Sequence, residues 1–223
     1  MDASRKIAVA GATGRVGRHV VDVLTAAGHE VVAMSRSTGV DVITGKGLAQ
    51  ALTGVECVID TATGPSPERS TATEFFTTAA ANLHKAGEQA GVQRMVVVSI
   101  IGIDRFTAGY NAAKLAHEQA ALSGPVPVRI LRAAQFHEFV AELVDWGRRG
   151  EVTHVPRMRT QLVAARTVAE ALAGLAVAAE PAPSGAPIPE IAGPRPENLD
   201  EMAALHLARR GDPTRVEGVS DPN

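Results

Sequence analysis

The residues best suited to acid–base chemistry are Tyr110 and Lys114. They stand four positions apart, so on a helix they share one face. An ammonium beside a phenol favours the phenolate, which predicts that Lys114 lowers the pKa of Tyr110 toward the range useful for proton transfer. Ser99, at the end of the preceding apolar run, adds a hydroxyl that can polarise a carbonyl group. His117 follows on the same helix, where we expect it to be a packing residue.

A second chemical pattern is the glycine loop Gly11-Ala12-Thr13-Gly14-Arg15-Val16-Gly17. It follows the apolar run Ile7–Ala10 and opens a segment, Gly14–Ala27, whose apolar residues recur at helical spacing. A pyrophosphate needs backbone N–H donors at close range and the positive end of a helix, and side chains would obstruct that approach. The strand–loop–helix order therefore predicts a dinucleotide site. We expect its contacts to come from Gly11, Thr13, Gly14, Arg15, Val16 and Gly17.

The second expected strand indicates which dinucleotide is bound. An acidic residue about 20 positions beyond the loop would accept from the ribose 2′-hydroxyl of NAD. This chain has Arg36 in that place, and a guanidinium there suits a 2′-phosphate. Arg15 is close enough in the loop to approach the same phosphate. The sequence therefore favours NADP(H), with NAD(H) as the less favoured cofactor.

The elements expected around these residues alternate between strands and helices. Continuous apolar strands with helices between them are typical of a parallel sheet covered on both faces. We therefore predict an α/β fold: a Rossmann-type, doubly wound, mainly parallel sheet within a single domain over residues 1–223, with about 151–223 forming a small substrate-capping lobe. The expected strands are Ile7–Ala10, Glu30–Met34, Val40–Ile43, Cys57–Ile59, Met95–Val98, Pro127–Leu131, Val152–Val155, Gln161–Ala164, Ile188–Ala192 and Arg215–Val219. The expected helices are Gly14–Ala27, Leu48–Leu52, Thr73–Ala90, Asn111–Leu122, His137–Arg148, Val168–Ala179 and Leu199–Arg209, with Pro181–Pro187 as a turn-rich connector.

Several of these stretches resemble, in order, the short-chain dehydrogenase/reductase superfamily, and specifically its atypical, NmrA-like NAD(P)-binding branch. They are the glycine loop, Asp41-Val42, Asp60-Thr61-Ala62-Thr63-Gly64, Val96-Val97-Val98-Ser99 and Tyr110-Asn111-Ala112-Ala113-Lys114.

The resemblance implies further site residues. Asp41 and Val42 would form the adenine wall, the segment Thr61, Ala62 and Thr63 would border the ribose, and Lys114 would hydrogen-bond the nicotinamide ribose. Ala133 and Ala134 stand where relatives carry a proline-containing segment beside the nicotinamide. Substrate contacts are expected from Ile100, Phe136, His137 and Met158.

Composition excludes several other classes of protein and binding site. The formal charge of −2 favours no nucleic-acid partner, and the single cysteine, Cys57, excludes an internal disulfide framework and a cysteine zinc site. No stretch approaches the roughly 18 apolar residues of a membrane span, and no signal peptide is recognisable, so we expect a cytoplasmic protein. It would act as a monomer or a homodimer on a small molecule. The ending Ser220–Asn223 leaves open whether the C-terminus is complete.

These inferences lead to three functions. The leading one is an NADPH-dependent oxidoreductase that reduces a carbonyl, enone or quinone-like small molecule by hydride transfer, with Tyr110 as proton donor. The resemblance to NmrA-like proteins also allows an NADP(H)-sensing regulatory protein without turnover. An epimerase or dehydratase that uses bound NADP internally is less favoured, because such relatives usually have a larger sugar-nucleotide lobe.

Overall fold

The protein is described by a computed structural model that covers residues 4–178 and 186–220. The chain forms two compact units. The first contains the described residues up to Arg132 and from Arg166 to Glu190; the second contains Ala133–Ala165 and the described residues from Ile191. The second unit begins at Ala133, and the described residues between Arg166 and Glu190 belong to the first unit.

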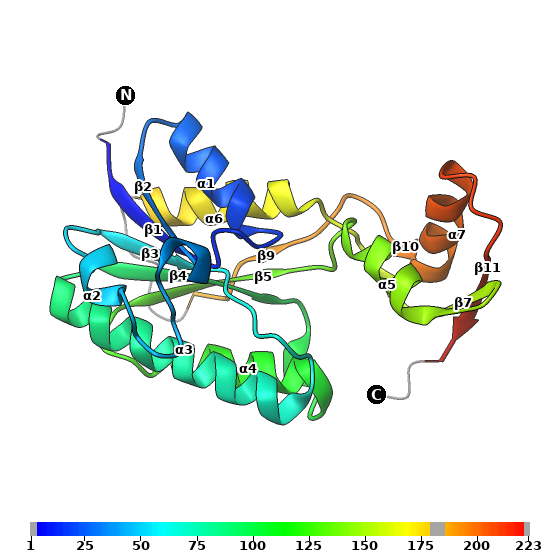
Figure 1. The fold of residues 1–223 in the computed structure, drawn as a ribbon, viewed down its shortest axis with the longest axis horizontal. Helices are drawn as coiled ribbons and strands as arrows, with labels where there is room; N and C mark the ends of the chain where they lie inside the picture. The colour runs from blue at the N-terminus through cyan, green and yellow to red at the C-terminus, as the bar shows by residue number, and fades with distance from the viewer. Residues whose placement is uncertain (1–3, 179–185, 221–223) are drawn as a thin grey trace. The chain divides into compact units, whose positions relative to one another are not determined.

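A six-stranded sheet forms the centre of the first unit, in the order β2-β1-β3-β4-β5-β9 (Figure 1). The pairs β1–β2, β1–β3 and β3–β4 are parallel. Their register aligns Ala10 with both Met34 and Asp60, so the carboxyl ends of β1, β2 and β3 lie at one edge. The strand order reverses at β1, and in such sheets ligands bind at that switch point. The strands are β1 (Lys6–Ala10), β2 (Glu30–Met34), β3 (Cys57–Asp60), β4 (Arg94–Ile100), β5 (Val128–Ala133) and β9 (Glu190–Ile191).

Helices cover both faces of this sheet, which explains why β3 and all but the first residue of β1 are buried. In Figure 1, α1 and α6 lie over one face and α3 and α4 over the other. Glu68 caps α3 by accepting from the backbone N–H groups of Ser70 and Thr71, and Gly91 ends it with φ of 75°. The helices are α1 (Gly17–Ala26), α2 (Leu48–Ala51), α3 (Arg69–Ala90), α4 (Gly109–Leu122) and α6 (Ala165–Val177), with short 3₁₀ turns η1 (Arg36–Thr38) and η2 (Ile103–Arg105).

The predicted α/β, mainly parallel architecture is confirmed, but two predicted strands were wrong. Val40–Ile43 forms a turn, because the Asp41 carboxylate accepts from the N–H groups of Ile43 (2.8 Å) and Thr44 (3.4 Å) and draws the chain away from an extended conformation. Gln161–Ala164 contains only a single bridge residue, Val163, while the nearby strand is β8 (Arg159–Thr160). The connector at Pro181–Pro187, the expected end of α6 at Ala179 and the last residues, from Asp221, fall wholly or mostly outside the described residues.

The second unit has a small core of its own. Helices α5 (Phe139–Gly147) and α7 (Leu199–Arg209) accompany a sheet in the order β11-β7-β6. Side chains such as Val144, Val155 and Leu207 are buried between them. Within the described chain, no helix is long and apolar enough to cross a lipid bilayer. The strands are β6 (Arg148–Arg149), β7 (Val152–Pro156) and β11 (Arg215–Val219), and β8 pairs separately with β10 (Glu197–Asn198).

Candidate active site

The glycine loop connects β1 to α1 and is packed too tightly for side chains at two of its glycines. A Cβ on Gly17 would lie 2.1 Å from the carbonyl oxygen of Gly11 and 2.7 Å from Thr61 Oγ1. Gly11 has φ of +73°, and a Cβ there would lie 2.8 Å from the backbone of Ala62. Gly14 is less confined, since its Cβ would meet only the Gly11 oxygen at 3.1 Å. Gly11 and Gly17 thus allow the loop to approach the end of β3, and Gly14 keeps the cleft open.

A cleft of about 550 Å³ lies in front of this loop, at the switch point of the sheet. Most of the predicted dinucleotide contacts line it, and Val16 and Gly17 are buried within the loop. The predicted contacts that do not line the cleft are Arg15, Val16, Gly17, Lys114, Ala133 and Ala134. One wall is the N-terminal half of α3, which the sequence did not indicate. The predicted residues that line the cleft are Gly11, Thr13, Gly14, Arg36, Asp41, Val42, Thr61, Ala62 and Thr63, and those added by α3 are Thr71, Glu74, Phe75 and Thr78.

The wall predicted to face adenine is the turn at Asp41–Thr44, which a side chain of α3 stabilises. Asn82, on α3, donates from Nδ2 to the carbonyl oxygens of Val42 (2.9 Å) and Ile43 (2.7 Å). Together with the carboxylate of Asp41, this amide fixes the turn that replaces the expected strand. Asn82 lies about 40 positions from its partners, so no local pattern in the sequence could have indicated it.

Arg36 lies at the start of η1, immediately after β2, and is exposed at the cleft. The segment around it is fixed by a reciprocal cap: Ser35 Oγ accepts from the Thr38 N–H, and Thr38 Oγ1 accepts from the Ser35 N–H. A guanidinium at this position can reach an anionic group in the cleft without breaking an ion pair, because no salt bridge joins it to another described residue.

The predicted catalytic helix α4 carries Lys114 into the interior. Its Nζ lies 2.8 Å from the carbonyl oxygen of Val98 and 2.9 Å from His117 Nδ1, and 4.5 Å from the centre of the Phe76 ring. His117 Nε2 in turn lies 3.1 Å from Asp60 Oδ2. Lys114, His117 and Asp60 are 5%, 1% and 1% exposed, so three ionisable side chains form a chain that is closed to solvent.

The electrostatics of this chain follow from its burial. Burial lowers the pKa of Lys114 to about 8, against the opposing effect of the Asp60 and Glu118 carboxylates. Burial also lowers the pKa of His117, with the Lys114 charge acting in the same direction. For Asp60, burial alone would raise the pKa, but the hydrogen bonds from His117 and the Ala62 N–H and the nearby charges lower it overall. The arrangement is therefore an ammonium, a neutral imidazole and a carboxylate.

Tyr110 and Ser99 complete the predicted catalytic set. The Tyr110 ring packs edge-on against Phe76, and burial raises its pKa to about 12. This shift is opposite to the one expected from the sequence, because burial disfavours the charged phenolate. The Ser99 Oγ is buried and has no hydrogen-bond partner among the described residues. A buried hydroxyl without a partner is costly, which is typical of a group that meets a ligand.

The remaining predicted residues are divided between the units. Ile100 ends β4 in the first unit and is half-buried. In the second unit, Ala133 and Ala134 are buried, Met158 packs on the small core, and Phe136 forms the bridge with Val163.

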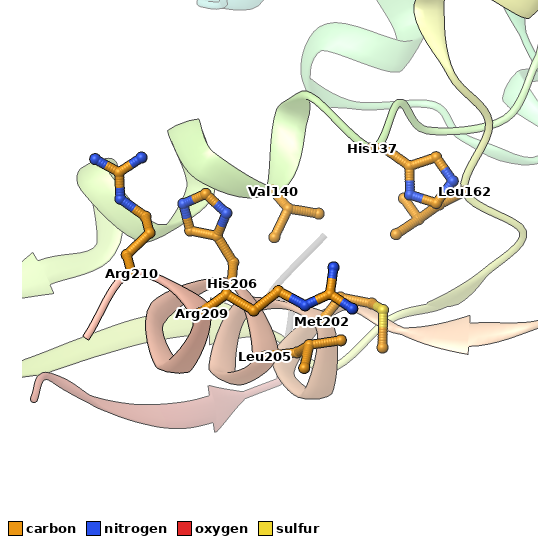
Figure 2. Close-up of a pocket in the computed structure, with 8 residues that line it drawn as sticks. All are labelled: His137, Val140, Leu162, Met202, Leu205, His206, Arg209 and Arg210. Carbon is orange, nitrogen blue, oxygen red and sulfur yellow. The ribbon is translucent and has the colours of Figure 1, made fainter. Parts of the chain in front are cut away.

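His137 lines a separate cavity of about 260 Å³ inside the second unit. Figure 2 shows its side chain beside Leu162, with α7 supplying the other wall. The lining residues are His137, Val140, Leu162, Met202, Leu205, His206, Arg209 and Arg210.

The fold and the cleft define a Rossmann-type dinucleotide-binding protein. The chain belongs to the NAD(P)H-binding family, whose model matches residues 11–173. This confirms the predicted membership among NAD(P)-binding proteins. No curated protein sequence matches the chain.

Solved structures share the fold at low sequence identity. MoeE5 in complex with UDP-glucose and NAD is 22% identical, with a TM-score of 0.78 over 98% of this chain and 87% of that one. The dTDP-4-dehydrorhamnose reductase of Bacillus anthracis str. Ames, in complex with NADP, is 16% identical, with a TM-score of 0.75 over 99% and 86%. The triphenylmethane reductase of Citrobacter sp., complexed with NADP(H), is 21% identical, with a TM-score of 0.64 over 96% and 79%.

Proposed function

We propose that the protein is an NADPH-dependent oxidoreductase that reduces a carbonyl, enone or quinone-like small molecule. The observation that carries the proposal is the buried, unpartnered Ser99 hydroxyl beside the Val98 carbonyl that anchors Lys114. A buried hydroxyl left unsatisfied near the end of β4, one residue after the carbonyl that Lys114 binds, is ready to bind an oxygen atom of a ligand.

The cleft residues fit a nicotinamide dinucleotide. A side chain on Gly11 or Gly17 would collide with the loop backbone, while the mouth at Gly14 stays open for a pyrophosphate. Lys114 uses two of its three N–H donors on Val98 and His117, which leaves one for a ribose hydroxyl. When bound, NADPH supplies the hydride.

The chain's own residues supply orientation and the proton. The Ser99 hydroxyl donates a hydrogen bond to the substrate oxygen and so stabilises the negative charge that develops there. Tyr110, neutral because burial raises its pKa to about 12, donates its phenolic proton to that oxygen as hydride reaches the substrate.

The preference for NADP(H) rests on Arg36. Its exposed guanidinium borders the cleft at the end of β2, where a 2′-phosphate would lie, and the segment supplies no carboxylate to accept from a ribose hydroxyl. Structures of similar fold contain NAD or NADP, so the preference depends on this residue and not on the fold.

The experiment is NADPH oxidation against a panel of aldehydes, ketones, enones and quinones, comparing the wild type with Tyr110→Phe. We expect Tyr110→Phe to bind NADPH like the wild type and to lose about 100-fold or more in kcat, the usual contribution of a positioned acid. Ser99→Ala should lose kcat as well. Turnover that survives Tyr110→Phe intact would remove Tyr110 from the mechanism.

A regulatory protein that senses NADP(H) without turnover is the second candidate. It is favoured by one observation, namely that Lys114 does not lower the pKa of Tyr110 but is bound to Val98 and His117. Calorimetric titration with NADP⁺ and NADPH distinguishes the two functions. A marked difference between their affinities, without turnover of any panel compound, would favour the sensor.

A further inference from the structure

The side chains behind Lys114 form a continuous hydrogen-bonded chain that the proposed reaction does not use. It runs from the Lys114 ammonium through the His117 ring to the Asp60 carboxylate, and the His117 ring is stacked on Phe76 with centroids 4.7 Å apart. Asp60 and His117 are 57 residues apart in sequence and come from β3 and α4. Burying three ionisable groups is expensive unless each is hydrogen-bonded, as these are.

We propose that Asp60 and His117 are positioning residues: the Asp60 carboxylate holds His117 in the tautomer whose Nδ1 accepts from Lys114, and this links the charge and place of Lys114 to the dinucleotide cleft. The effect of these residues on turnover rests on the proposed function. The tautomer of His117 and its control by Asp60 do not depend on that function.

The tautomer follows from the donors and acceptors present. A carboxylate only accepts, so His117 must present Nε2–H to Asp60 Oδ2. A neutral ring then has a lone pair on Nδ1, which accepts from the Lys114 ammonium at 2.9 Å. If Asp60 became an amide with its NH₂ group toward Nε2, the ring would carry its proton on Nδ1. That proton would face the N–H bonds of Lys114, and the link would break.

The link to the cleft lies in the other oxygen of Asp60. Its Oδ1 accepts from the Ala62 N–H at 2.9 Å, and Ala62 lines the dinucleotide cleft. The neighbouring Thr61 hydroxyl donates to the Ala10 carbonyl at 2.7 Å, at the start of the glycine loop. One carboxylate therefore fixes the segment expected to border the ribose and, through His117, the lysine expected to bind that ribose.

The groups that face Lys114 come from three elements, two of which supply a charge. Asp60 approaches from β3, Glu118 lies on α4 itself, and α3 presents the uncharged ring of Phe76. Glu118 is bound in a two-pronged ion pair by Arg132 of β5, at 3.0 and 2.9 Å, and Arg132 also contacts Asp104 of η2 at 3.4 Å. Since Glu118 is neutralised by Arg132, Asp60 is the carboxylate whose charge mainly supports the ammonium.

The first experiment reads the tautomer directly, in ¹⁵N-labelled protein without cofactor, by long-range ¹H–¹⁵N correlation of the histidine rings at pH 6–9. We expect His117 to be neutral with its proton on Nε2 in the wild type, and on Nδ1 in Asp60→Asn. His84 is an internal control in the same spectra, because the Val126 N–H donates to its Nδ1 and its Nε2 faces the Ala121 carbonyl. Its tautomer should be the same in both proteins.

The second experiment follows the charge of Lys114 by NMR titration of its side chain. In Asp60→Asn the midpoint should fall by about one pH unit or more, since a neighbouring opposite charge is lost. His117→Gln is the conservative variant, because an amide can accept from Lys114 and donate to Asp60. It should restore most of the wild-type midpoint and NADPH affinity that His117→Leu loses.

The outcomes separate this inference from the proposed function. A wild-type His117 that carries its proton on Nδ1, or a Lys114 midpoint unchanged in Asp60→Asn, would overturn the inference even if the enzyme turns over. The wild-type tautomer is informative even if Asp60→Asn does not fold. Conversely, a wild type that neither binds nor oxidises NADPH would end the proposed function and leave both NMR readouts standing.

The consequence for NADPH is a shift in pH dependence. NADPH fluorescence titrations should show wild-type affinity falling above about pH 8, where Lys114 loses its proton. In Asp60→Asn the fall should begin about one unit lower, so that affinity at pH 8 is about fivefold weaker, since the ammonium fraction at that pH drops from about one half to about one eleventh. A uniform loss at every pH would indicate a merely structural role for Asp60.

Discussion

The glycine loop and the Lys114 cluster meet at the carboxyl end of β3, yet they are built in opposite ways. The loop works through missing side chains: Gly11 and Gly17 let backbone approach backbone, and the expected ligand contacts are N–H groups. The cluster works through side chains that are difficult to bury, namely an ammonium, an imidazole and a carboxylate closed to solvent. The comparison indicates that the first region depends on shape and the second on charge, so substitutions and pH should affect them differently.

The largest effect on stability and NADPH affinity is expected at Gly17, where the loop leaves least room for a side chain. Gly17→Ala would place a methyl group 2.1 Å from the Gly11 oxygen, so the loop must move away from β3. We expect roughly 1–3 kcal/mol of lost stability and a loss of NADPH affinity of about 100-fold. Chemical denaturation and fluorescence titration measure the two effects, which should not depend on pH.

The control is Gly174→Ala in α6, where a Cβ meets nothing within 4 Å. Because alanine favours helix over glycine, this variant should be as stable as the wild type or more so. If Gly17→Ala bound NADPH as well as Gly174→Ala does, the role assigned to the glycine loop would be wrong.

Arg36 tests whether charge also contributes to NADPH binding at the cleft in front of the glycine loop. Arg36→Ala should weaken NADPH binding by about 30-fold, since a hydrogen bond between charged groups contributes about 1.5–3 kcal/mol, and should leave NADH binding nearly unchanged. Arg166→Ala, which removes an exposed arginine paired with Glu170 on α6, is the matched control. Equal losses for both cofactors would show that Arg36 does not read the 2′-phosphate.

The Lys114 cluster should make the free energy of unfolding depend on pH. Lys114 has a pKa of about 8 when folded and about 10.5 when unfolded, so between these values the unfolded chain binds more protons and stability rises with pH. From pH 8 to 9 the free energy of unfolding should gain about 1 kcal/mol from this group. Lys114→Met should lack that gain.

The comparison with Lys114→Met isolates the lysine from other groups. Cys57, whose pKa burial raises to about 12, subtracts stability above about pH 9, but it does so in both proteins. Denaturation curves at pH 7, 8 and 9 are sufficient. Parallel pH profiles for the two proteins would mean that Lys114 is not buried as a cation.

The smallest effect is expected at the adenine wall. Asn82→Ala removes two hydrogen bonds to the turn at Val42 and Ile43, but the Asp41 carboxylate still holds that turn. NADPH affinity should fall about fivefold, at a net cost near 1 kcal/mol, with kcat unchanged. Gln119→Ala, an exposed amide on α4, should change neither value. A loss of kcat in Asn82→Ala would mean that the turn also influences the cluster.

The two regions also differ in how far the sequence could predict them. The glycine loop was found from its own residues, because strand, glycines and helix follow one another along the chain. The strands of the first sheet were found because continuous apolar runs mark burial on both faces. Val40–Ile43 misled the prediction, since its apolar residues suit a strand but the Asp41 side chain turns the backbone.

The cluster could be predicted only in part. The spacing of Tyr110 and Lys114 singled them out, but the expected lowering of the Tyr110 pKa was wrong, because burial of the phenol raises that pKa to about 12. His117 looked like a packing residue, and its link to Asp60 depends on a pairing of β3 with α4 that no local pattern encodes. The spacing of residues along the chain cannot predict such contacts between distant segments.

The way the chain passes between its two units has a consequence for folding. The edge strand β9 pairs with β5, through bonds such as Arg132 N–H to the Pro189 carbonyl at 3.0 Å, yet 55 or more residues separate the partners. As the chain emerges during synthesis, β5 therefore has an open edge until the segment near Glu190 arrives. Long-range pairing of this kind is slow and leaves an exposed edge prone to association. A chain truncated before residue 186 should accordingly depend more on chaperones than the full-length chain does.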